Sequence, residues 1–179
     1  MTLFAATLLP GLVLFFVGAP LALGSTWASA SFRSFPRSAA ASYLFFGAAA
    51  CWFLFNIWHL SAADFGDYRV LLFIGFTLVA TLAFRCVPDF LSVRGLCILI
   101  LLAASPLLDA AYMEYERPLR LLMVTPLYVA IALAIWVGAQ PWRMRDFLEW
   151  LFARPGRSRR GGALIAAYGL LLCGVAFTF

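Results

Sequence analysis

The chain has 179 residues, of which 65% are hydrophobic and 12% are charged. Soluble domains carry about 25% charged residues, so this chain has too little polar surface to cover a water-soluble fold. The net charge of +5 comes from arginine alone, because the sequence contains no lysine. Nucleic-acid-binding proteins are also basic, but most of these arginines lie at the edges of apolar runs, where membrane topology explains them. We therefore expect an integral membrane protein without a nucleic-acid partner.

Six apolar runs are candidates for helices that cross the roughly 30 Å hydrocarbon core of a bilayer, with flanking arginines lengthening the shorter ones. They cover residues 3–23, 39–60, 70–84, 90–113, 119–138 and 163–179. The first resembles a signal peptide only in position, because no basic segment precedes it and its apolar run is too long. Pro10 and Pro20 are expected to kink it or to loosen its ends. The prediction is an all-α, polytopic helical bundle that forms one membrane domain over residues 1–179.

The longest polar interval between these runs is residues 141–160. It carries six arginines: Arg143, Arg145, Arg154, Arg157, Arg159 and Arg160. Cytoplasmic loops of membrane proteins carry an excess of Lys and Arg. With this interval inside, ten of the thirteen arginines lie on the cytoplasmic side, and both termini lie on the outer side. Arginine without lysine is typical of GC-rich bacterial genomes, which favours a bacterial inner membrane.

Residues 142–153 within this interval mix large apolar side chains with charged ones. The pattern, although broadened by Trp150 and Phe152, predicts a helix that lies in the membrane interface before the last span. Pro155 and Gly156 are expected to end it. The six arginines then have two interpretations. They either bind anionic lipid headgroups or an acidic partner, or they only anchor the topology, which is the interpretation that we favour.

Small residues recur in the last apolar run at a spacing that places them on one helical face. They are Gly162, Ala166, Gly169, Cys173 and Ala176. Small faces let membrane helices approach closely and gain packing contacts. The pattern therefore predicts that this helix packs on another helix, in this chain or in a neighbouring one. It carries no chemistry.

Four polar residues lie toward the outer ends of the second and fourth runs: Asn56, His59, Asp109 and Glu114. His59 is the only histidine, and Asn56 lies on the same helical face. If the two runs are neighbours, these residues converge on a ligand or proton site. The alternative, which we favour, is a hydrated histidine at the interface. One histidine cannot supply a His-rich metal site and no CxxCH motif occurs, so neither a metal nor a cofactor is expected.

No signature of a soluble enzyme occurs, whether GxSxG, a Walker loop, GxGxxG or HExxH, so no catalytic residue is assigned and we lean toward a protein that is not an enzyme. No acid or histidine is centred in a run, which argues against a proton-coupled pump. The leading hypothesis is a protein that works by association, as a subunit or scaffold of a membrane complex or as a homo-oligomer. A second is a transporter or channel for small solutes or ions, with its site at the outer ends of the second and fourth runs. A third, ranked below both, is an enzyme that modifies lipid at the interface.

Overall fold

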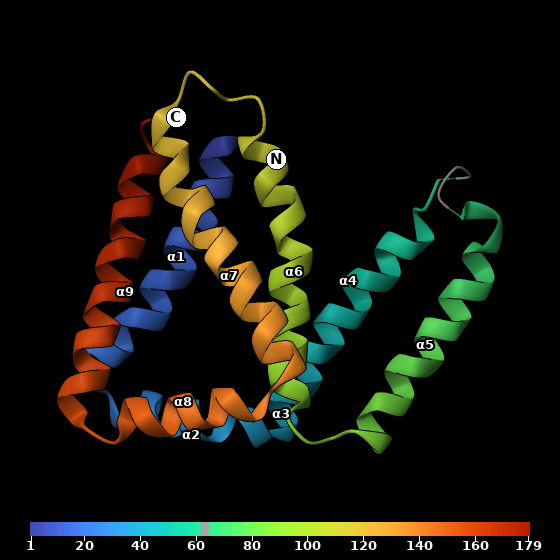
Figure 1. The fold of residues 1–179 in the computed structure, drawn as a ribbon, viewed down its shortest axis with the longest axis horizontal. Coiled ribbons are helices and arrows are strands. Elements are labelled where there is room, and N and C mark those ends of the chain that lie inside the picture. The colour runs from blue at the N-terminus through green and yellow to red at the C-terminus, as the bar shows by residue number, and fades with distance from the viewer. Residues whose placement is uncertain (62–64) are drawn as a thin grey trace.

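A computed structural model describes residues 1–61 and 65–179, and the regular structure in these ranges is entirely helical (Figure 1). Six of the helical segments are long and apolar enough to cross a membrane. They are α1 (Leu3–Ala22), the continuous run of α3, η2 and α4 (Ala39–Trp58), α5 (Arg69–Cys86), α6 (Leu91–Ala111), α7 (Leu121–Ala139) and α9 (Pro155–Ala176). The predicted all-helical fold is therefore confirmed, and its six long apolar helices are those of an integral membrane protein.

The spans pack as three neighbouring pairs: α1 with α9, α6 with α7, and α4 with α5 (Figure 1). The first two pairs meet at the end of the molecule where both chain termini lie, which we call the terminal end. They diverge toward the opposite end. Ten of the thirteen arginines lie at that opposite end, which we call the arginine end.

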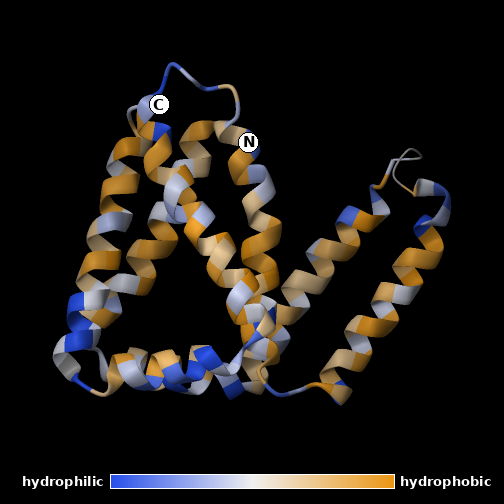
Figure 2. Cartoon of the chain, viewed as in Figure 1, coloured by the Kyte–Doolittle hydropathy of each residue, from blue (hydrophilic) through white to orange (hydrophobic). Residues whose placement is uncertain are grey.

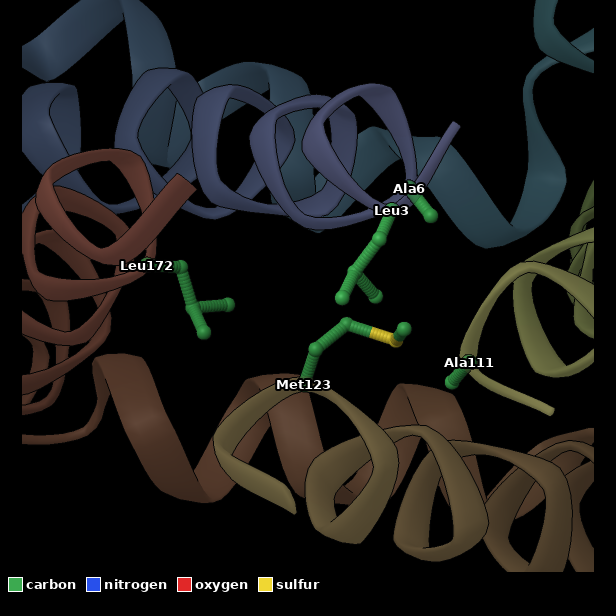
Figure 3. Close-up of a cluster of buried hydrophobic side chains, with 5 residues drawn as sticks. All are labelled: Leu3, Ala6, Ala111, Met123 and Leu172. Carbon is green, nitrogen blue, oxygen red and sulfur yellow. The ribbon is translucent and has the colours of Figure 1, made fainter. Parts of the chain in front are cut away.

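A buried apolar cluster holds the first two pairs together at the terminal end (Figure 3). Its members are Leu3 and Ala6 of α1, Ala111 of α6, Met123 of α7 and Leu172 of α9. Met123 and Leu172 are each 1% exposed. The Tyr168 hydroxyl of α9 donates a 2.6 Å hydrogen bond to the Leu122 carbonyl oxygen of α7. Four spans are thus joined at this end by side-chain packing, and the Tyr168 hydrogen bond links two of them.

Two short helices lie across the arginine end: α2 (Thr26–Ser34) and α8 (Trp142–Phe152). The Ser25 side chain caps α2 by accepting a hydrogen bond from the Ala28 amide. Arg33 of α2 donates a 2.9 Å hydrogen bond to the Phe152 carbonyl oxygen of α8, and its guanidinium lies over the Phe152 ring. Figure 2 shows hydrophilic residues concentrated in this layer and at the opposite loops, with apolar residues along the spans.

The structure corrects several predicted boundaries. Helix α9 begins at Pro155, ahead of the predicted start of the sixth span at residue 163, so Arg157, Arg159 and Arg160 lie in its first turns rather than in a loop. Clustered arginines are typical of a loop, but they also occur where a helix extends beyond the apolar layer of the bilayer. Helix α2 was not predicted at all. The third span reaches from Arg69 to Cys86, beyond the predicted 70–84, and α1 continues as helix through both of its prolines.

The second span changes its winding at η2 (Ser42–Phe46), a π-helical turn between α3 (Ala39–Ala41) and α4 (Gly47–Trp58). Gly95 of α6 packs against this turn, and a Cβ atom added there would lie 2.5 Å from the Phe46 Cα atom. Only glycine admits so close an approach. Beyond this junction α4 leaves α6, so that α4 and α5 project as an arm (Figure 1).

Candidate functional site

A cavity of about 1330 Å³ lies above α8, where α1 and α9 diverge from α6. Its volume exceeds the roughly 300–1,000 Å³ of pockets for drug-sized ligands. Side chains from α1, η2, α6 and α9 form its walls, and α2 and α8 contribute its floor. The apolar lining includes Val13, Val17, Phe45, Leu96, Leu148 and Ile165. The space is therefore apolar and lies between helices that cross the membrane.

Three arginines stand at the edge of this cavity: Arg154, Arg157 and Arg160. Arg157 and Arg160 share a face of α9, because they are three residues apart. Arg157 is held in place, since it donates a 2.8 Å hydrogen bond to the Trp150 carbonyl oxygen and lies 4.2 Å from the centre of the Trp150 ring. Arg154 and Arg160 are exposed, and their guanidinium groups have no hydrogen-bond or ion-pair partner in residues 1–61 and 65–179.

The acidic residues of the 141–160 interval are engaged elsewhere. Arg145 bonds Asp146 at 2.8 Å and reaches Glu149 at 3.7 Å. The hydrogen bond to Asp146 raises the pKa of Arg145 above its ordinary value. Arg143 donates a 2.6 Å hydrogen bond to the Gln140 side-chain oxygen. The positive charge of the three cavity arginines is therefore not neutralised by the two acids on α8.

Arg159, the remaining arginine of the interval, faces a different place. Its guanidinium packs against Gly24, whose φ of +66° is one that L side chains rarely adopt. Both residues line a second, smaller cavity of about 140 Å³, together with Ser25, Ser29 and Arg33. The structure thus divides six arginines that look equivalent in the sequence into three at the large cavity and three elsewhere.

The small-residue face of α9 packs against α1. A Cβ atom added to Gly169 would lie 2.6 Å from the Phe15 amide nitrogen, and one added to Gly162 would lie 2.5 Å from the Ala22 nitrogen. Ala166 and Cys173 meet two glycines of α1 in the same way: Gly18 and Gly11. These two glycines were not predicted to take part in the contact, although their seven-residue spacing places them on one helical face.

The four polar residues proposed as a site are not brought together. His59 Nδ1 lies 2.8 Å from the carbonyl oxygen of Phe55 in its own helix. Asp109 accepts a 3.5 Å hydrogen bond from Ser105, one turn away on α6. Glu114 pairs with Arg117 at 3.7 Å, and Asn56 is exposed on α4. The ends of α4 and α6 that carry these residues lie apart (Figure 1), so the predicted convergence is absent from the structure.

The arm exposes α5 along its length. Its ring contacts are with the second span, as in the stacking of Tyr43 on Phe84 and the edge contact of Phe53 with Phe76. No described residue of α5 is buried. Gly75 has no atom within 4 Å of the position of an added Cβ atom. This span therefore has a neighbour on one side only.

Comparison with known proteins shows no relative of this chain: no family model, no curated protein and no solved structure matches it. Within residues 1–61 and 65–179, no group of three or more His, Cys, Asp and Glu residues could hold a metal ion. Among the described residues, the arginine-edged cavity and the one-sided arm are two features with room for another molecule.

Proposed function

We propose that the protein works by association, as a subunit or scaffold of a membrane complex, with the arm as its contact surface. The supporting observation is that α5 crosses the membrane with the second span as its packing partner and with no buried residue among those described. The proposed occupant of the open side is a transmembrane helix of another membrane protein.

Glycine placement favours a helix over lipid as the neighbour of the arm. Apolar exposure alone identifies no partner, because lipid tails are as apolar as leucine. Glycine, however, costs about 1 kcal/mol relative to alanine inside a helix. Gly11, Gly18 and Gly95 each permit a close helix contact within the chain. In the arm, Gly47 and Gly75 permit none, so they offer close approach to a helix from outside.

The arm hypothesis predicts that Gly75→Leu releases the partner while leaving the protein folded. No atom lies within 4 Å of the added Cβ position, so the leucine side chain starts in open space within the chain but blocks the approach of a second helix. Native mass spectrometry of the protein extracted from its own membranes should show a stoichiometric complex for the wild type and the free chain for the variant.

Gly174→Leu is the matched control, because Gly174 is the same residue type in a span and is equally open, while the packing face of its helix is already covered by α1. This control should keep the complex. If Gly75→Leu keeps it too, the arm is not the contact surface. The complex could instead contain only copies of this chain. If Gly75→Leu abolishes such an assembly, the partner of the arm is a second copy of this chain and not another protein.

We propose further that the arginine end is cytoplasmic, that α8 lies at the membrane surface and that the membrane is a bacterial inner membrane. Support comes from the arginine distribution, since cytoplasmic loops carry excess Arg. Cysteine substitutions at two exposed positions test the orientation in a background without the native cysteines: Glu116 at the terminal end and Ala153 at the arginine end. An impermeant maleimide should label Glu116→Cys on intact cells and Ala153→Cys only after permeabilisation. The opposite pattern would invert the topology.

A further inference from the structure

We infer that the large cavity is a binding site for an anionic lipid, whose headgroup phosphate lies at Arg154, Arg157 and Arg160 and whose acyl chain enters the apolar space. This inference goes beyond association and does not depend on the arm. It assigns a ligand to three of the six arginines. From the sequence, all six had the same two interpretations: they anchor the topology, or they bind lipid headgroups or an acidic partner.

The lining determines what the deep part of the cavity can hold. Water is stable in a protein cavity when it has about two to four polar partners. The walls supply almost none, because they consist of aliphatic and aromatic side chains such as Val17, Leu96 and Ile165. A hydrocarbon chain needs no hydrogen bonds and gains dispersion contacts with such walls. The space also lies beside the spans, where acyl chains are the surrounding solvent.

The edge of the cavity supplies the charge that an anionic headgroup requires. Arginine offers five N–H donors in a planar fork that matches phosphate oxygens. Arg157 is already positioned by Trp150, and its other donors are available for a ligand. The guanidinium groups of Arg154 and Arg160 have no hydrogen-bond or ion-pair partner in the described ranges. Three arginines beside an apolar cavity thus complement a molecule with an anionic head and an apolar tail.

Other anionic ligands match only part of this arrangement. A free phosphate ion would use the arginines but leave the large apolar cavity unused. An acidic peptide would bring polar backbone groups into a space that cannot satisfy them, which costs free energy. A zwitterionic lipid would fill the cavity but bring its own positive charge to the arginines. An anionic lipid satisfies both parts.

The test measures the binding of phosphatidylglycerol and of phosphatidylcholine with identical acyl chains to the purified protein, by lipid titration in native mass spectrometry. The wild type should prefer phosphatidylglycerol. The double variant Arg154→Gln/Arg160→Gln removes two guanidinium groups with no hydrogen-bond or ion-pair partner in residues 1–61 and 65–179, so the fold should persist. Its affinity for phosphatidylglycerol should fall about 25-fold, at about fivefold for each arginine.

The matched control is Arg143→Gln/Arg145→Gln, which removes the same charge from the same interval but outside the cavity lining. It should keep the preference. If both double variants lose affinity equally, the arginines act only through net charge and the site is refuted. Val17→Trp places an indole in the cavity and should weaken the binding of both lipids. Unchanged binding in this variant would show that the acyl chain does not lie in the cavity. If glycerol phosphate binds as tightly as phosphatidylglycerol, the headgroup alone binds and the acyl-chain part of the site is also refuted.

Discussion

Replacing Gly169 with leucine should destabilise the protein by about 1–3 kcal/mol or more, the cost of overpacking a close-packed interior. An added Cβ atom would lie 2.6 Å from the Phe15 nitrogen and 2.7 Å from the Gly11 oxygen. Both are backbone atoms of α1, which cannot move aside as a flexible side chain can. The variant must therefore separate α9 from α1, and this separation also disturbs the walls of the cavity.

The measurement is the free energy of unfolding in mixed detergent micelles, obtained by titrating a denaturing detergent against the helical circular dichroism signal. Gly174→Leu provides the control, because it makes the same change on the same helix where no atom lies within 4 Å. It should unfold at nearly the wild-type denaturant fraction. Equal stability of the two variants would show that α1 and α9 do not pack through this glycine.

Alanine at Gly95 and alanine at Gly47 should have effects of opposite sign. At Gly95 the new methyl group would meet the Phe46 backbone, with 2.5 Å to its Cα atom, so the variant should lose about 1–3 kcal/mol. At Gly47 the methyl group would meet no atom within 4 Å, and the gain in helix propensity should add up to about 1 kcal/mol. The chemical change is identical at the two positions, so the difference reports the contact alone.

The same detergent titration measures this pair. Since Gly95 packs against the π-helical turn that joins the arm to α6, its variant should also expose the arm to limited proteolysis sooner than the rest of the chain. A stable Gly95→Ala protein would mean that the arm is attached by other contacts. A destabilised Gly47→Ala protein would mean that the helix is packed where the structure leaves it open.

The number and type of the spans follow from the sequence, because membrane crossing depends on the length of apolar runs, which is a local property. The runs at residues 3–23 and 90–113 agree with α1 and α6 to within two residues at each end. The even number of spans places both termini at one end. The face that contains Gly169 was also readable, since helical periodicity alone shows which residues align. Even so, the pattern could not name α1 as the helix that meets it.

Two polar helical segments were not predicted, because their signal is not the length of an apolar run. The start of α9 at Pro155 was hidden by its arginines, and α2 by small polar residues that loops also contain. The predicted meeting of His59 with Asp109 required α4 and α6 to stay together. The π-helical turn and Gly95 instead join these helices at the arginine end, and they separate toward the terminal end.

What the sequence by itself determined is therefore the class of molecule and the clustering of its arginines. Only the tertiary structure decided which of these arginines share a site. Arg154, Arg157 and Arg160 line the large cavity, while Arg145 is engaged with Asp146. The reason is physical. The cavity exists because two pairs of spans diverge over α8, and the angle between them is set by contacts between segments that are far apart in the sequence. Spacing along the chain carries no record of it.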